Sequence, residues 1–216
     1  MTTILKQQQA QLDQEFQPLA GHEVTGAITT VFETNKINAH VYTEFIDQLH
    51  NPDFLENLRE IDEIIVIIVL TKNSQGPSPN FEGNHWFLLI TDQSLREIFL
   101  FDTYGRTLST VYAPFQFDVP NWLEKTISLV PKVEAVAGEA CGYYVIRFCE
   151  IISTNWFLNG TLVDIIYRAC DDFNSLFKTP HYILSESQKP FNNQQSELLC
   201  IQNDRKVMQQ VSQRLH

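Results

Sequence analysis

A histidine, an acid and a cysteine stand where they could form a catalytic site. His85 opens one short apolar run, Asp102 closes the next, and Cys141 precedes a segment of helical pattern. An imidazole can take the proton of a thiol, and a carboxylate can hold the imidazole in the required tautomer and orientation. The three residues therefore indicate nucleophilic catalysis by a thiolate, provided that the fold brings them together.

The apolar runs His85–Thr91 and Arg96–Asp102 are predicted to be antiparallel strands with a four-residue connection. In that register His85 faces Asp102, and directly opposed residues point to one face with Cβ atoms ~4.5–5.5 Å apart. The imidazole and the carboxylate would then meet at the edge of a sheet. The alternative is an ordinary surface ion pair, with Trp86 as a core residue.

Cys141 is expected at the N-terminus of a helix over residues 141–159. The helix dipole and the free N–H groups would favour its thiolate there. Gly142 would allow the backbone of a substrate to come close. The backbone N–H of Cys141 could also bind a developing oxyanion. The alternative is a buried structural cysteine.

Taken together, the motifs resemble those of the adenain-like and SUMO-deconjugating cysteine peptidase superfamily. The matching residues are His85-Trp86, Asp102-Thr103-Tyr104-Gly105 and Ala140-Cys141-Gly142, in that order and with seventeen residues from the histidine to the acid. The resemblance covers residues 64–158, and residues 184–199 are weakly similar to the tail of adenovirus-type maturation proteases. Ala-Cys-Gly and the brief interval from Asp102 to Cys141 are closest to the adenovirus, virophage and Maverick-type branch.

The resemblance implies a role for each matching residue. Cys141 would be the nucleophile, His85 the general base and acid, and Asp102 the orienting acid. Trp86 and Gly142 are candidates for the walls of the substrate groove. The resemblance implies no cofactor and no metal.

One position departs from the family pattern. The family usually carries a glutamine six or seven residues before the cysteine, where its amide helps to form the oxyanion hole, but Ala135 and Glu134 stand here. An ionised carboxylate cannot donate a hydrogen bond and would repel an oxyanion. Glu134 is expected to point to solvent, which would leave the oxyanion to backbone N–H groups. The alternative is a buried Glu134 whose protonated form donates a hydrogen bond.

The rest of the chain is expected to position these residues within one α+β domain, residues 1–216. The fold would be a small mixed β-sheet packed by helices, with Cys141 at the N-terminus of a central helix, as in the adenain-like fold. Ile64–Leu70 has the continuous β-branched composition of a strand covered on both faces, and residues 71–84 read as a loop. Apolar spacing predicts helices over residues 39–49, 53–59, 121–129, 141–159, 162–177 and 194–215, and the Gln-rich stretch up to about residue 18 is expected to be a peripheral helix or an ordered arm.

Composition limits the classes of partner. The 216 residues are 44% hydrophobic and carry a formal net charge of -11, which disfavours binding to nucleic acid or to anionic membranes. Cys149, Cys170 and Cys200 match no zinc spacing and are expected to be free thiols that fill space. The start of the chain has no apolar run typical of a secretory signal.

The resemblance implies a cysteine endopeptidase that cleaves after small residues, at Gly-Gly-like sites, and matures viral capsid or precursor proteins. Its partner would be a protein substrate, with an activating peptide as a further candidate, and it would act as a monomer. Its expected location is the host cytoplasm or virus factory and the virion. The runner-up is a deconjugating peptidase for ubiquitin or a ubiquitin-like modifier. The third reading, based on the missing glutamine, is a catalytically inactive peptide-binding module.

Overall fold

The computed structural model describes residues 3–72, 74, 85–115, 117–130, 132–135, 139–177 and 193–215. Its centre is a mixed sheet in the order β1-β2-β3-β4-β5. The middle strands pair antiparallel, whereas β1 with β2 and β4 with β5 pair parallel. The strands are β1 (Ala39–Phe45), β2 (Ile64–Leu70), β3 (Trp86–Thr91), β4 (Phe99–Phe101) and β5 (Ile127–Ser128).

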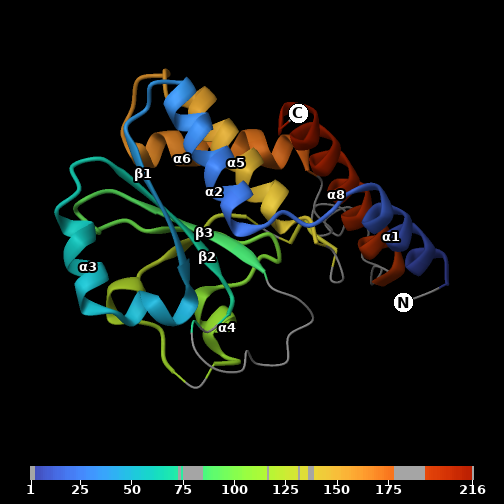
Figure 1. Ribbon diagram of the computed structural model, residues 1–216, viewed down its shortest axis with the longest axis horizontal. Helices are drawn as coiled ribbons and strands as arrows, with labels where there is room; N and C mark the ends of the chain where they lie inside the picture. Colours follow the sequence, from blue (N-terminus) through green and yellow to red (C-terminus); the bar gives the residue numbers. More distant parts are fainter. Residues whose placement is uncertain are drawn as a thin grey trace, which may run out of the picture.

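Helices cover both faces of the sheet (Figure 1). Helices α2, α5, α6 and α8 pack on one face, and α3, α4 and two 3₁₀ turns pack on the other. The expected α+β class, with a small mixed sheet packed by helices, is confirmed. The helices are α1 (Thr3–Glu15), α2 (Gly21–Thr34), α3 (Pro52–Arg59), α4 (Leu108–Tyr112), α5 (Cys141–Asn155), α6 (Leu162–Leu176) and α8 (Asn193–Leu215), and the 3₁₀ turns are η1 (Ile46–His50) and η2 (Asn121–Leu123).

Strand β2 has the environment that its sequence predicts. Its residues alternate between the two apolar clusters, with Ile64, Val66 and Ile68 in one and Ile65 and Ile67 in the other. Both faces of the strand are therefore in the core, which is why its sequence is continuously apolar.

Three expectations about local structure are wrong. Residues 39–49 form β1 and η1 instead of one helix, because β1 pairs along its whole length with β2. Residues 121–129 give only η2 and the short β5, which pairs with β4. Helix α2, which was not predicted, covers the sheet beside α5, and Figure 1 shows the two side by side. The predicted loop over residues 71–84 lies largely outside the described residues, as does much of the 184–199 tail segment.

The register of the hairpin also differs from the predicted one. Leu88 pairs with Phe101, which is a shift of two residues, and the connection runs from Asp92 to Ile98. The side chain of Asp92 accepts the N–H of Ser94, so a longer turn forms before β4. A shift of two residues preserves the faces of a strand, whereas a shift of one would exchange them.

Helix α5 runs through the centre of the larger cluster, where Phe148 stacks on Phe101 of β4 with ring centroids 4.1 Å apart. This packing fixes the start of α5, and with it Cys141, relative to the end of β4. Helices α1 and α8 lie against each other at one end of the molecule (Figure 1). In the part of the chain that the structure describes, no helix has the length and apolarity needed to cross a bilayer.

Candidate active site

Cys141 is the first residue of α5, and only 5% of it is exposed. Burial, and then the neighbouring Glu134, raise the pKa of the Cys141 thiol well above its ordinary value. The backbone N–H groups of Trp86 and Gly142 oppose this shift but do not outweigh it. The expectation that the helix terminus favours the thiolate is thus overridden, and the resting thiol keeps its proton at neutral pH.

His85 stands directly before β3 and is held by its backbone. The N–H of Thr71 donates to the carbonyl of His85 at 3.0 Å, and the N–H of His85 donates to the hydroxyl of Thr71 at 3.1 Å. The imidazole stacks on Tyr104 with ring centroids 4.4 Å apart. Burial lowers the pKa of His85, and Asp102 opposes this only in part. The resting imidazole is therefore neutral.

Asp102 follows β4 and is held on both oxygens. Oδ1 accepts the N–H of Tyr104 at 2.7 Å, and Oδ2 accepts two hydrogen bonds from the Arg106 guanidinium at 3.0 and 2.8 Å. Burial by itself would raise the pKa of Asp102, but His85 and Arg106 together lower it below its ordinary value. Asp102 is therefore a fixed, ionised carboxylate with Oδ1 3.6 Å from Nε2 of His85.

Glu134 does not point to solvent, so that expectation is wrong. The residue is fully buried, and its Oε2 accepts a hydrogen bond from the hydroxyl of Thr103. Burial, followed by the charge of Asp204, raises the pKa of Glu134 well above its ordinary value, although the hydroxyl of Thr103 and the backbone N–H of Cys141 lower it in part. The buried, protonated alternative describes this environment better.

Helix α8 holds the segment that carries Glu134. Asp204 accepts the N–H of Ala135 at 3.2 Å and lies 3.0 Å from the hydroxyl of Tyr144. The side-chain amide of Asn203 donates to the carbonyl of Val133 at 3.1 Å. The C-terminal helix thus fixes the backbone on both sides of Glu134, and burial raises the pKa of Asp204 to about 8.

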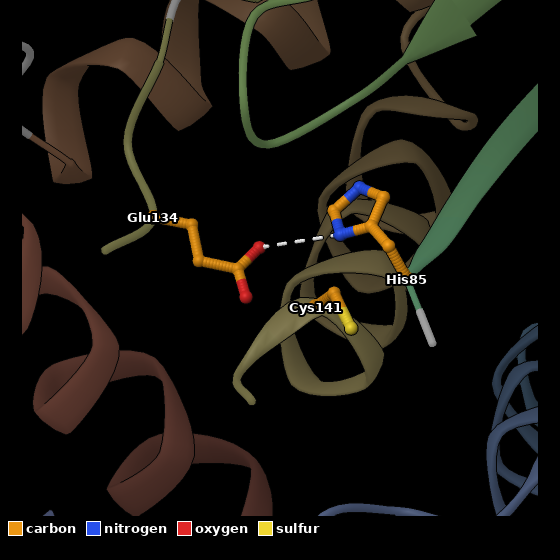
Figure 2. Close-up of side chains that lie close together, drawn as sticks. All are labelled: His85, Glu134 and Cys141. Carbon is orange, nitrogen blue, oxygen red and sulfur yellow. Dashed lines mark ion pairs between the residues drawn. The ribbon is translucent and has the colours of Figure 1, made fainter. Parts of the chain in front are cut away.

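The predicted residues come together at one end of the sheet. Donor atoms of His85, Glu134 and Cys141 all lie within 4.8 Å of one another (Figure 2). Nδ1 of His85 is 3.9 Å from Oε2 of Glu134, while Nε2 faces Asp102. The separations exceed hydrogen-bond lengths, as is common for catalytic groups before a substrate is bound. The imidazole can therefore relay a proton on its Nδ1 side while Asp102 holds the other side.

A cleft of about 1440 Å³ leads to this cluster. Trp86 and Gly142, the two candidate groove residues, both line it together with the start of α2. A Cβ added to Gly21 would lie 3.1 Å from the ring of Trp86, and one added to Gly142 would lie 3.2 Å from Val24. Gly21 and Gly142 therefore allow Trp86 and the start of α5 to pack closely against α2 and the segment before it.

Sequence reasoning missed two contributors. Arg106 lies four residues after Asp102, and an Arg at that spacing after a buried acid was the available signal. The polar pair Asn203 and Asp204 lies in an amphipathic helix more than sixty residues after Cys141, and nothing local marks it as part of the site.

No protein-family model and no curated protein matches the sequence. Among solved structures, the chain is similar to that of "SUMO protease Ulp1 with the catalytic cysteine oxidized to a sulfinic acid". The TM-score is 0.37 and the sequence identity 14%, over 70% of this chain and 74% of that chain. The assignment of a function therefore depends on the geometry of the site.

Proposed function

We propose that the protein is a cysteine peptidase with Cys141 as nucleophile, His85 as general base and acid, and Asp102 as orienting acid. One observation carries the proposal. A buried, neutral imidazole stands between a fixed carboxylate and a thiol at the start of a helix, and a cleft opens onto the imidazole and the thiol. These are the parts that thiol-dependent acyl transfer requires.

The chemistry follows from the protonation states. His85 takes the proton of Cys141 as the sulfur attacks the carbonyl carbon of the scissile peptide bond. Asp102 stabilises the imidazolium that forms, which then gives its proton to the leaving amine as the C–N bond breaks. A water molecule, deprotonated by His85, attacks the thioester and releases the new carboxyl group and the thiol.

The oxyanion would be bound at the start of α5. The backbone N–H of Cys141 is one donor, and Glu134 is the second when it carries a proton. An ionised Glu134 would repel the oxyanion and would compete for the same N–H. The environment that raises the pKa of Glu134 supports the protonated form.

The shape of the cleft supports cleavage after small residues. Trp86 packs against Gly21 at the wall of the cleft, and this close approach favours a substrate with small side chains there. We therefore propose Gly-Gly-like sites as the substrate sequence. Together with the viral-type motifs of the sequence, this leads us to propose maturation of viral capsid or precursor proteins as the biological role.

The test is a cleavage assay on two substrate sets at equal concentration. One set holds capsid-precursor peptides with Gly-Gly-like sites, and the other holds ubiquitin and SUMO fusions; Cys141→Ala is the blank. Cleavage of the precursors supports the proposal, and cleavage of the fusions alone would replace it with deconjugation. No cleavage, together with no labelling of Cys141 by an active-site-directed thiol reagent, would mean a peptide-binding module.

A further inference from the structure

Figure 2 shows three side chains of types that bind metal ions lying close together, with the carboxylate of Glu134 directed toward the imidazole of His85. An imidazole, a carboxylate and a thiol, from His85, Glu134 and Cys141, have donor atoms within 4.8 Å of one another. All three residues are buried, with 5%, 0% and 5% exposed. Within the residues that the structure describes, this is the one group of three or more His, Cys, Asp or Glu side chains with donors so close.

Polar atoms of this cluster lack a hydrogen-bond partner within the described part of the chain. Neither Nδ1 of His85 nor Oε1 of Glu134 has a hydrogen-bond partner among the described residues, although both atoms are buried. The hydroxyl of Thr103 engages only the other oxygen, Oε2, of Glu134. Buried polar atoms without a partner are rare in folded proteins and call for a specific reason.

We infer that His85, Glu134 and Cys141 bind one Zn²⁺ ion, which reversibly blocks the nucleophile. The inhibitory consequence rests on the proposed peptidase function, whereas the metal site itself does not. Zinc takes thiolate, imidazole and carboxylate ligands at ~2.0–2.3 Å in a tetrahedron, with water in a fourth position. Such ligands are roughly 3.3–3.8 Å apart, so donor atoms that lie within 4.8 Å of one another need to close by about 1.5 Å at most.

The outer shell of such a site is already built. Zinc-binding histidines usually turn their second ring nitrogen to a carboxylate, which fixes the tautomer. Here Nε2 of His85 faces Asp102, which Arg106 and the N–H of Tyr104 hold in place. Nδ1 is thereby left with a lone pair directed to the side of Glu134 and Cys141.

Charge and donor type both select zinc. Zinc binding would release the protons of Cys141 and Glu134 to solvent, and the divalent cation would cancel the two negative charges of the thiolate and carboxylate that form. The sulfur and nitrogen donors exclude magnesium and calcium, which prefer oxygen. His85 and Cys141 line the cleft, so an ion can reach the site from solvent. The glutamine that relatives usually carry in place of Glu134 would offer no anionic ligand.

The first experiment is a titration of the reduced full-length chain with CoCl₂. Binding at this site gives a thiolate-to-cobalt charge-transfer band, and Cys141→Ala is expected to abolish it. The affinity for Zn²⁺ is then measured by competition with a chromophoric chelator. Glu134→Gln is expected to weaken Zn²⁺ binding by at least about tenfold, because even indirect partners of a metal ligand typically contribute that much.

Glu139→Gln is the matched control, since Glu139 lines the cleft beside Cys141 and undergoes the same change of side chain. Its zinc affinity is expected to equal that of the wild type. An equal affinity in Glu134→Gln, or a charge-transfer band that survives Cys141→Ala, would overturn the inference.

Activity gives a separate readout. In a peptidase, Zn²⁺ should inhibit and EDTA should restore the full rate. A chain with the cobalt spectrum and no peptidase activity would retain the metal site and lose the proposed function. A chain with peptidase activity and no cobalt spectrum would retain the proposed function and lose the metal site.

Discussion

Replacing Asp204 by asparagine should change how the stability of the protein depends on pH. Asp204 is fully buried on α8 beneath the segment that carries Glu134. Burial is the main reason why its pKa is raised to about 8. The hydrogen bonds from Ala135 and Tyr144 and the charge of Lys132 oppose this rise, whereas the charge of Glu197 adds to it. In an unfolded chain the pKa of an aspartate is about 4.

The sign follows from the proton count. Between about pH 4 and pH 8 the folded chain holds the Asp204 proton and the unfolded chain does not. The free energy of unfolding therefore falls as pH rises through that window, by about 1.4 kcal/mol per pH unit for this one proton. Above pH 8 this contribution to the slope ends.

Asparagine is a close substitute for the protonated acid. The hydroxyl of Tyr144 lies 3.0 Å from Oδ1 of Asp204 and 3.4 Å from the carbonyl of Val133, and it has one proton to donate. If Asp204 donates to Tyr144, the proton of Tyr144 is free for Val133. The amide of Asp204→Asn can donate in the same way, while its oxygen accepts the N–H of Ala135.

The assay is urea unfolding at several values between about pH 6.5 and 7.5. In this window His85 is neutral in the folded state, and cysteine thiols of the unfolded chain still hold their protons. The slope of the free energy of unfolding against pH is expected to be less negative for Asp204→Asn than for the wild type, by about 1.4 kcal/mol per pH unit. Asp62→Asn, at an exposed acid, controls for the change in net charge. Equal slopes for wild type and Asp204→Asn would refute the reasoning.

Three further predictions concern the chemistry of the site. Cys141→Ala should lose nearly all peptidase activity, and Asp102→Asn should lower the activity less than His85→Ala does, because Asp102 only orients and stabilises the ring. The measurement is kcat/KM of each variant for one peptide. Full activity in Cys141→Ala would exclude the mechanism. The alkylation rate of Cys141 by iodoacetamide should keep rising through pH 9, because burial and Glu134 raise the thiol pKa, and a plateau near neutral pH would contradict this. Activity should fall as pH rises through the raised pKa of Glu134, and Glu134→Gln should keep its activity there; superimposable pH–rate profiles would eliminate Glu134 as a proton-bearing donor.

The parts of the site that local sequence determines were predictable. The continuous apolar run of β2, the helix that starts at Cys141 and the proximity of His85 to Asp102 all depend on neighbouring residues. The proximity survived a register error of two residues because β-strands alternate with a period of two.

The parts that depend on distant partners were not predictable. Residues 39–45 carry apolar side chains at a helical spacing, yet pairing with β2 makes them an edge strand. Glu134 has the side chain of a surface residue, yet it is buried, and Asn203 and Asp204 of α8 hold the backbone on both sides of it. Tertiary contacts of this kind leave no trace in the surrounding sequence.

The two carboxyl groups of the site have opposite environments, and this separates their roles. Asp102 sits against Arg106 and His85, so its charge is neutralised and its pKa lowered. Glu134 sits against Asp204 in a buried segment, so its pKa is raised. Asp102 can therefore stabilise the imidazolium, while a neutral Glu134 leaves the oxyanion unopposed.

The same arrangement explains why the resting site tolerates its burial. With Asp102 paired to Arg106, and with Glu134, His85 and Cys141 all uncharged, no net charge is buried. In the proposed mechanism, charge separation begins only with proton transfer from Cys141 to His85, when a substrate carbonyl is present to receive the thiolate. In the proposed mechanism, a glutamate at position 134 is compatible with catalysis as long as burial and Asp204 keep it protonated, and this gives α8 a part in setting its charge.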